Sequence, residues 1–391
     1  MDLRKFPADL DAVGRVAKRR TLIEKELKVN LDALQISPQQ IGSADERNCE
    51  QMFGAVPLPV GLAGPLKIRF SSGETKEIYL PLATTEGALV ASVNRGCKAL
   101  TEAGGVTVSS EYVGITRSIA FEVNDRKEIS GKIRALESAW KKIAHASSRH
   151  LKILSYEIDA KDDVLFLTIA ADTAEAMGMN MVTIAAQAVG EFLSKKLDIP
   201  MVTVAGNVDS DKKASTRTKR LGRGYRVEAA VTLPSETIRR VLKSDSHALI
   251  KTARAKLEIG SKIAGALSKN LHVANTLAAL YLATGQDVAH VVEGSLADTS
   301  VSSARGGIRI SLELPAILVG IRGGGTDLPA QKQCLDLLLK AKTKLRPTTQ
   351  LAETIGSAVL AGELSLLAAQ ATNTLARAHL MLSRRKHASK W

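Results

Sequence analysis

The stretch LKILSYEIDAKDDVLFLTIAA, at residues 151–171, decides how the middle of the chain folds. Its two halves, Leu151–Ile158 and Val164–Ala171, are rich in aliphatic residues and are separated by AKDD, which suits a turn. The stretch therefore predicts two strands joined by a short connection. Apolar residues recur with a helical period before it, over Lys127–Ser147, and after it, over Asn180–Leu197.

Two more strand-like segments, Ser118–Val123 and Pro200–Val208, flank these helices. The resulting order of strand, helix, strand, strand, helix and strand is that of the split βαβ, or ferredoxin-like, unit. We predict that residues 118–203 form such a subdomain, which is inserted into a larger domain made of residues 55–117 and 204–391.

The rest of the chain predicts a large α/β domain around a central buried helix, preceded by a small helical segment at residues 1–54. Ser261–Thr284 is the candidate for the central helix, because it is largely apolar. The predicted fold class is therefore α+β. The other expected elements are a helix capped by Thr84 or Thr85, a strand at Val227–Pro234, a helix over Ser235–Leu257, strands around Arg309–Leu314 and Ala316–Ile321, and a last helix from about Thr354 to Leu382.

The composition is that of a globular protein with a strong positive charge. Of 391 residues, 45% are hydrophobic and 24% are charged, which argues against disorder. Lysine and arginine exceed aspartate and glutamate by 54 − 40 = 14. This excess favours a polyanionic partner, namely nucleic acid, an anionic membrane or a ligand with several phosphates.

The three cysteines, Cys49, Cys97 and Cys334, show no CxxC spacing, so the sequence predicts neither a disulfide framework nor a metal site. The N-terminus, MDLRKFPADLDAVGRVAKRR, contains no apolar core of a signal peptide. The longest apolar stretch, Ile263–Thr284, is interrupted by polar residues, whereas a membrane span needs about 20 mostly apolar residues. We expect a soluble, cytoplasmic protein with no membrane partner.

Single motifs leave several interpretations open. The GGGT segment, Gly323–Thr326, is either a tight turn or a loop whose N–H groups approach an anion. The basic run from Lys212 to Arg226 is either a solvated loop or a contact with phosphate or nucleic acid, although Tyr225 is its only aromatic residue for base stacking. Three further candidates also have ordinary structural explanations, as a helix cap or as core histidines: Asp287, His272 and His379.

Longer blocks occur together in one order and at one spacing, which is far more specific than any single motif. They are PLPVGLAGPL, TTEGALVASVNRGCKAL, EAMGMNMV, GNVDSDKKA, HVANTLAALYLATGQD, GGGTDLPAQKQCL, and LAGELSLLAA followed by ARAH. On these blocks the sequence resembles the hydroxymethylglutaryl-coenzyme A (HMG-CoA) reductase family, in particular the catalytic portion of its class I members. The resemblance covers roughly residues 45–383.

The resemblance implies an enzyme that uses two NADPH to reduce HMG-CoA to mevalonate and free coenzyme A. Lys212 matches the lysine that stabilises the developing oxyanion, and Glu86 matches the acid that protonates the aldehyde-level oxygen. Asp287 matches a nearby carboxylate that tunes both groups. His379 matches the histidine that protonates the departing thiolate.

The resemblance to the family also implies which residues bind the substrate and the cofactor. By resemblance, the substrate and coenzyme A contact Ser92, Asn94, Arg95, Lys98, Arg117, Asn207, Lys243, Lys256, His272, Asn275 and Ser365. NADPH contacts Ser148 and Arg149 through its adenosine 2′-phosphate, the helix start at Met177, Gly178, Met179 and Asn180, and the loop of Gly323, Gly324, Gly325 and Thr326. Active sites of the family lie at a dimer interface, where the DKK loop comes from the other subunit. We therefore expect a homodimer or homotetramer, without nucleic acid as a partner.

The sequence departs from the family pattern at a few positions, but every catalytic position is retained. Ala205 replaces a serine that contacts the acyl group, Glu175 replaces an aspartate, and Ile321 and Arg322 replace threonine and valine beside the cofactor. The main function is expected to be HMG-CoA reduction. The alternative is a reductase of a related acyl-CoA thioester with shifted acyl specificity.

Overall fold

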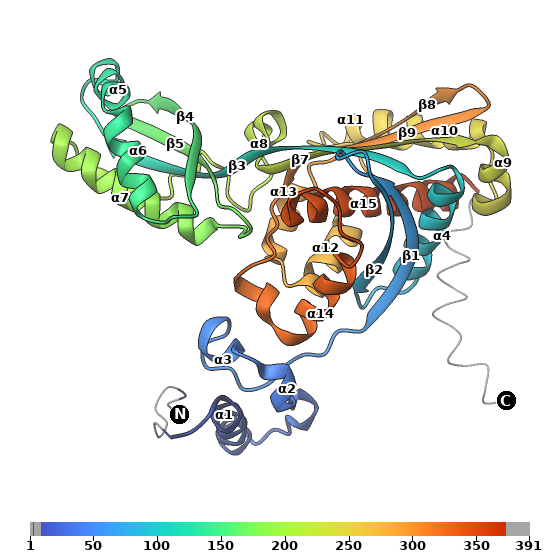
Figure 1. The fold of residues 1–391 in the computed structure, drawn as a ribbon, viewed down its shortest axis with the longest axis horizontal. Coiled ribbons are helices and arrows are strands. Elements are labelled where there is room, and N and C mark those ends of the chain that lie inside the picture. The colour runs from blue at the N-terminus through green and yellow to red at the C-terminus, as the bar shows by residue number, and fades with distance from the viewer. Residues whose placement is uncertain (1–2, 4–8, 373–391) are drawn as a thin grey trace.

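The computed structural model describes residue 3 and residues 9–372. Figure 1 shows a small group of N-terminal helices, a central sheet with long helices packed against it, and a smaller sheet with its own helices. The two sheets share the long strand β3 (Val106–Glu122). This mixture of helices and strands, with a buried central helix and an inserted split βαβ unit, confirms the predicted α+β fold class.

The central sheet has the strand order β2-β1-β3-β7-β9-β8. Its neighbouring strands are antiparallel except for β1 and β3, which are parallel. Along β7, Val227, Ala229, Val231 and Leu233 are buried, because alternate side chains of a strand point to opposite faces. The other strands of this sheet are β1 (Val60–Arg69), β2 (Thr75–Ala83), β7 (Gly224–Pro234), β8 (Asp298–Ala304) and β9 (Gly307–Ile317).

The central buried helix is α15 (Pro347–Ala371) rather than the expected Ser261–Thr284, and it runs beneath this sheet in Figure 1. Of the described helices, it alone is long and apolar enough to cross a membrane, and 94% of its apolar window is buried inside the protein, as in a core helix. Its partner α4 (Leu89–Glu102) approaches closely at Gly96, where a Cβ atom would lie 1.9 Å from the carbonyl oxygen of Ala361. Only glycine permits this helix contact.

The smaller sheet has the order β6-β3-β5-β4, and all neighbouring strands are antiparallel. This is the strand order of the predicted split βαβ unit. β3 changes partner between Gly114, which pairs with β7, and Ile115, which pairs with β5. The other elements of this unit are α5 (Arg126–Ala135), α6 (Glu137–Ala146), β4 (Lys152–Lys161), β5 (Val164–Asp172), α7 (Met179–Leu197) and β6 (Met201–Thr203).

The expected helix over Ser261–Thr284 is wrong in its first half. Helical structure ends with α11 (Ser261–Ile263) and resumes only with α12 (Val273–Thr284). Gly265 between them adopts φ +65°, and the Asn270 side chain donates to two loop carbonyls. The polar residues that interrupt the apolar run therefore build a loop, and Ile263 is 83% exposed.

Other boundaries also differ from the sequence expectations. Ala88, rather than Thr84 or Thr85, precedes α4, and it has φ +75°, which places Glu86 in the loop before the helix. The helix expected over Ser235–Leu257 is interrupted at Lys243, which has φ +54°. Instead of the two strands expected around Arg309–Leu314 and Ala316–Ile321, there is the single strand β9, which ends at Ile317. The remaining elements are α8 (Thr216–Leu221), α9 (Ser235–Thr237), the π-helical turns η2 (Ile238–Leu242) and η3 (Arg254–Gly260), α10 (Ser246–Ala253), the 3-10 turns η4 (Val288–His290) and η5 (Gly324–Asp327), α13 (Val291–Gly294) and α14 (Pro329–Leu338).

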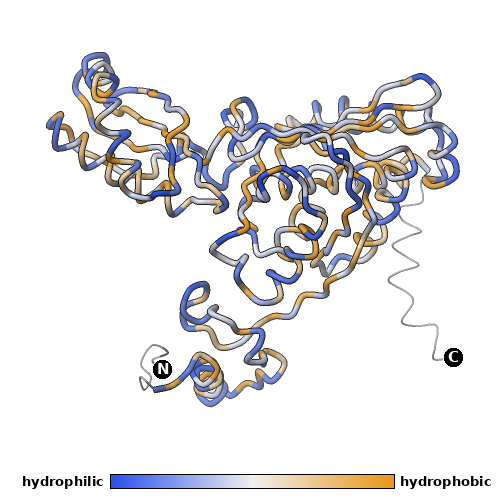
Figure 2. The backbone as a smooth tube through the Cα atoms, in the orientation of Figure 1, coloured by the Kyte–Doolittle hydropathy of each residue, from blue (hydrophilic) through white to orange (hydrophobic). Residues whose placement is uncertain are grey.

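The N-terminal helices form a small unit below the rest of the molecule in Figure 1. Hydrophobic and hydrophilic residues alternate around the coil of α1 (Figure 2), whose Val16 packs into a small core with Ile41 and Met52. The helical character expected for this segment is present. Its helices are α1 (Ala12–Leu27), the 3-10 turn η1 (Asp32–Leu34), α2 (Pro38–Ile41) and α3 (Ala44–Arg47).

The buried carboxylate of Asp45 ties this unit together, and we expect Asp45→Asn to loosen it. Asp45 pairs with Arg15 at 2.6 Å and with Arg19. Burial raises the pKa of Asp45, but the two arginines outweigh it, so the pKa is lowered overall. The stabilisation is therefore present at neutral pH and disappears as the pH falls through the lowered pKa. The variant should lose about 1–3 kcal/mol locally, measured as faster proteolysis of α1, while Glu26→Gln should have no effect.

Candidate active site

The pair of Lys212 and Asp287 lies at the surface where the two sheets meet. Lys212 belongs to the loop between β6 and α8 and has φ +57°. Asp287 follows α12 and caps η4 by accepting a hydrogen bond from the N–H of Ala289. The ammonium nitrogen of Lys212 lies 2.8 Å from Oδ2 of Asp287, and the side chains remain 42% and 35% exposed. Both groups are therefore accessible to a ligand.

The environment keeps Asp287 ionised at neutral pH. Burial raises the pKa of Asp287, but hydrogen bonds from Lys212 and from the N–H of Ala289 outweigh this effect and lower the pKa overall. The ionised carboxylate of Asp287 is the counter-ion of the Lys212 ammonium. The pair thus presents a cation with a fixed counter-ion to the solvent.

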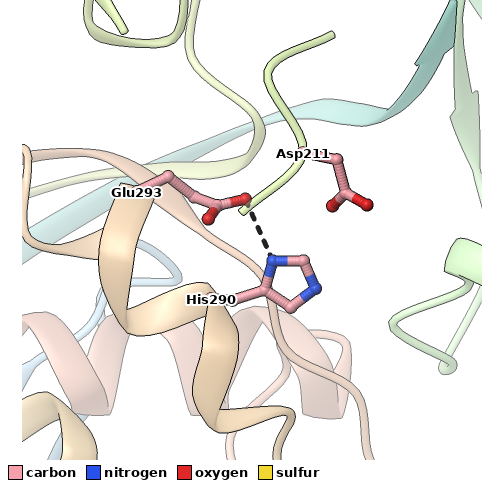
Figure 3. A group of neighbouring side chains, drawn as sticks. All are labelled: Asp211, His290 and Glu293. Carbon is pink, nitrogen blue, oxygen red and sulfur yellow. Dashed lines mark hydrogen bonds and ion pairs between the residues drawn. The ribbon is translucent and has the colours of Figure 1, made fainter. Parts of the chain in front are cut away.

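A buried ion network lies directly behind this pair. The guanidinium of Arg223 donates through Nη1 to Asp211 at 2.9 Å and to Glu293 at 2.7 Å. Glu293 also contacts Nδ1 of His290 at 3.0 Å, and Figure 3 shows these two side chains facing each other beside Asp211. The ligand atoms of the three residues lie within 4.8 Å of one another, as in metal sites. Because Arg223 already supplies a positive charge to both carboxylates, the cluster is better explained as an ion network than as a metal site.

Arg117 joins this network from β3. Its Nη1 lies 3.4 Å from Asp209 and 3.5 Å from Asp211, and its Nε donates to Thr183. Burial raises the pKa of Asp209, although both nearby arginines act in the opposite direction. The structure thus places Arg117 beside the loop that carries Lys212.

Glu86 lies at the other end of α12. Its carboxylate accepts a hydrogen bond from Nδ2 of Asn275 at 2.6 Å, which joins two residues of the predicted acyl site. Asn275 is in the first turn of α12, whereas Asp287 follows its last residue, Thr284. From Asn275 to Thr284 the helix rises about 14 Å at 1.5 Å per residue. A single chain therefore does not bring Glu86 together with the pair of Lys212 and Asp287.

The two predicted cofactor segments pack against each other and against the turn that holds Asp287. A Cβ atom on Gly320 would lie 2.3 Å from the amide nitrogen of Met177, and Ala176 forms a β-bridge with Arg322. On the other side, a Cβ atom on Gly285 would lie 2.2 Å from the carbonyl oxygen of Gly325. Three segments that are distant in sequence therefore converge beside Asp287.

The start of α7 is shaped to receive an anion. Gly178 has φ +89°, and a Cβ atom there would lie 2.3 Å from Thr173, so the turn requires glycine. Among the described residues, no side chain caps this 19-residue helix, which leaves its first N–H groups available. Lys152 of β4 pairs with Asp172 of β5, so the preceding Ser148 and Arg149 lie at the same end of the subdomain as this helix start.

The predicted coenzyme A residues gather where α4 crosses α15. Ser365 accepts hydrogen bonds from Ser92 and from Nε of Arg95, both at 3.0 Å, and its carbonyl accepts from Nη2 of Arg95. His272 lies beside them and is held by Glu363 at 3.1 Å. Burial lowers the pKa of Arg95.

The other predicted binding residues are more scattered. Asn94 accepts a hydrogen bond from the N–H of Gly64, and Lys243 is exposed at the end of η2, which packs on α4. Lys98 is exposed on α4, Lys256 lies on η3, and Asn207 is exposed with φ +64°. His379 lies outside the described residues.

Ion pairs within the chain account for much of the basic run from Lys212 to Arg226. Arg217 pairs with Glu157 and Asp159, while Lys219 pairs with Asp298 at 2.8 Å. Arg226 pairs with Glu313, and Arg223 and Lys212 are paired as described above. This neutralisation favours a loop held by ion pairs within the chain over a surface for nucleic acid.

One departure from the family pattern has a structural explanation. The carboxylate of Glu175 accepts a hydrogen bond from the N–H of Thr348 at 3.1 Å and pairs with Arg346 at 3.2 Å. A carboxylate at this helix N-terminus is favourable, because the first N–H groups of α15 lack partners within the helix. Glu175 therefore ties the cofactor segment to the central helix.

Sequence reasoning missed Asp211, Arg223, His290 and Glu293 as members of the site. Two signals could have indicated them. Asp211 directly precedes Lys212, and His290 and Glu293 follow Asp287 at intervals of three residues, the spacing that places side chains near one another in helical turns. Arg223 carried no such signal, because it is one of several basic residues in the run.

Sequence comparisons identify the family of the chain. A family profile described as hydroxymethylglutaryl-coenzyme A reductase matches residues 15–384. The 3-hydroxy-3-methylglutaryl-coenzyme A reductase of Methanocaldococcus jannaschii is 40% identical over 380 residues, which covers 94% of this chain and 92% of the relative. The reductase of Methanothermobacter thermautotrophicus is 38% identical over 371 residues, with the same two coverages.

The fold also has a close counterpart among solved structures. A class II reductase from Streptococcus pneumoniae, described as bound to NADPH in open conformations, has a TM-score of 0.68 at 20% identity and matches 90% of this chain and 96% of that one. This likeness is one of fold, whereas the archaeal relatives are similar in sequence along nearly their whole length. The chain belongs to the hydroxymethylglutaryl-coenzyme A reductase family.

Proposed function

We propose that this protein reduces HMG-CoA to mevalonate and free coenzyme A with two NADPH, and that Glu86, Lys212, Asp287 and His379 carry the chemistry. Family membership supplies the reaction, which belongs to the mevalonate pathway. The observation that supports the residue assignment is the 2.8 Å pair of Lys212 and Asp287 beside the convergent cofactor segments.

The residues fit the chemistry of thioester reduction. The thioester carbon accepts a first hydride, the C–S bond then breaks and the thiolate of coenzyme A leaves with a proton, and the resulting aldehyde carbon accepts a second hydride to become the primary alcohol. The ammonium of Lys212 would stabilise the oxyanion that forms at the carbonyl oxygen. Glu86 would protonate that oxygen at the aldehyde level, and His379 would protonate the thiolate.

The cofactor segments fit NADPH, which supplies the hydride when bound. The uncapped start of α7 would bind the pyrophosphate, and Arg149 with Ser148 would bind the 2′-phosphate. Gly323 and Gly324 have open space where a Cβ atom would lie, so a ring can approach their backbone. We assign residues 118–203 to the cofactor subdomain, residues 55–117 and 204–391 to the catalytic domain, and residues 1–54 to a helical extension.

The active enzyme is proposed to be a homodimer or a dimer of dimers in the cytoplasm. Because Glu86 and Asn275 lie at the opposite end of α12 from Lys212 and Asp287, one chain supplies two separate half-sites. In a symmetric dimer, the Glu86 half of one protomer would meet the Lys212 half of its partner. Each dimer would then contain two complete sites.

The function is tested with purified protein, HMG-CoA and NADPH. We expect NADPH absorbance to fall with two NADPH consumed for each mevalonate, which mass spectrometry identifies. A panel of CoA thioesters that differ in the acyl group tests the alternative, which the exposed Ala205 and Arg322 motivate. A higher kcat/KM for another thioester would favour shifted specificity, and no NADPH oxidation with any of them would refute the proposal.

Arg149→Ala tests the cofactor assignment. Arg149 is exposed at the cofactor end of the subdomain, where its Nε contacts only the neighbouring His150 among the described residues. Loss of one charge-assisted contact to the 2′-phosphate should raise the KM for NADPH about 10-fold and leave the KM for NADH unchanged. The exposed Arg134 of α5 is the matched control, and equal changes for both cofactors would contradict the assignment.

A further inference from the structure

We propose that Glu293, together with His290 and Arg223, is a positioning residue that holds Lys212 and Asp287 in their reactive arrangement. The inference rests on the proposed function, because it assumes that this pair is catalytic. None of the three residues is needed as a proton donor in the reaction. All three are buried, with exposed fractions of 0% for Glu293 and His290 and 1% for Arg223.

The first contact acts on the backbone of Lys212. Lysine rarely adopts a φ of +57°, because its Cβ atom then crowds the following carbonyl oxygen. Oε1 of Glu293 accepts a hydrogen bond from the N–H of Lys212 at 3.3 Å. Glu293 is 81 residues away in the chain. The bond therefore fixes the backbone from which the Lys212 side chain extends.

The second contact acts on Asp287 through His290. Nδ1 of His290 lies 3.0 Å from Oε1 of Glu293, within hydrogen-bond distance. Nε2 then faces Oδ2 of Asp287 at 3.6 Å and has no hydrogen-bond partner among the described residues. The ring thus fills the space behind Asp287, and the same Oδ2 faces Lys212 at 2.8 Å on its other side.

Arg223 anchors this group to the rest of the site. Its Nη1 lies 2.7 Å from Glu293 and 2.9 Å from Asp211, the residue before Lys212. Its Nε donates to Thr116 of β3, and its Nη2 lies 2.9 Å from Sδ of Met179, the first residue of α7. The group therefore connects the catalytic loop with the start of the cofactor helix.

The test compares two substitutions of Glu293. Glu293→Gln keeps an oxygen that accepts from Lys212 and Arg223, whereas Glu293→Leu keeps no acceptor. Because misplacement of a reacting group by about 1 Å costs about 100-fold in rate, we expect Leu to lower kcat about 100-fold and Gln about 10-fold. The KM values for HMG-CoA and NADPH should stay within about twofold, because neither ligand is proposed to contact Glu293.

Glu353→Gln is the matched control. Glu353 is another fully buried glutamate, and it accepts hydrogen bonds from Ser71 and Ser110 near the start of α15. Its substitution should lower Tm as much as Glu293→Gln does but leave kcat unchanged. Reduction of mevaldehyde should slow in the Glu293 variants as much as reduction of HMG-CoA, since Lys212 serves both steps.

The outcomes separate the two proposals. If the unaltered protein does not reduce HMG-CoA, the proposed function itself fails. If it does, and Glu293→Gln folds with a lower Tm but a normal kcat, Glu293 is only structural and the inference is wrong. If Glu293→Leu does not fold, Glu293→Gln and His290→Leu test the positioning role instead. Both variants are expected to lower kcat with little change in KM.

Discussion

Lys212→Ala is expected to lower kcat for HMG-CoA about 1,000-fold, since removal of one preorganised donor to an oxyanion costs about 100- to 1,000-fold. The ammonium is 42% exposed and is held at 2.8 Å by Asp287, so it is already placed before a substrate binds. The loss should fall on kcat, because the charge it stabilises develops only in the transition state. Steady-state kinetics with saturating NADPH measures the effect.

A surface lysine provides the control for this variant. Lys132→Ala removes a similar ion pair, with Glu128, from an exposed turn of α5 and should leave kcat unchanged. Circular dichroism and Tm should match the unaltered protein for both variants, because exposed ion pairs contribute little to stability. A folded Lys212→Ala enzyme with a nearly normal kcat would remove Lys212 from the mechanism.

Mixing two inactive variants is expected to restore activity. Glu86→Gln and Lys212→Ala disable the two half-sites that one chain places at opposite ends of α12. In a hybrid dimer, one site contains both defects and the other contains none. Random mixing makes half of the dimers hybrids, so co-expression should recover about one quarter of the normal activity.

Differently tagged copies sharpen this experiment. Hybrids purified through both tags should have about half of the normal activity per dimer, while each variant alone should have almost none. A mixture of Lys212→Ala with Asp287→Asn should recover nothing, because these defects lie in the same half-site. Pure hybrids of Glu86→Gln and Lys212→Ala without activity would contradict a site shared between protomers.

The elements that the sequence predicted well are those with a local signal. The hairpin of β4 and β5 and the helix α7 follow from hydrophobic period and turn residues, which depend only on near neighbours. The helix predicted over Ser261–Thr284 is wrong in its first half. An apolar run does not show whether another segment will pack against it, and here Ile263 is 83% exposed. β1 and β8 were not expected, although each pairs antiparallel with the strand that directly follows it in the chain.

By itself, the sequence indicated the family of this protein and the candidate residues for its chemistry: a lysine, two carboxylates and a histidine in blocks that resemble the HMG-CoA reductase family. Only the tertiary structure decided which of them meet. It placed Lys212 against Asp287, put Glu86 at the far end of α12, and buried Arg223 among carboxylates although the sequence shows it in a basic run. The physical reason is that burial and pairing of charges depend on contacts between segments far apart in the chain, which no local pattern encodes.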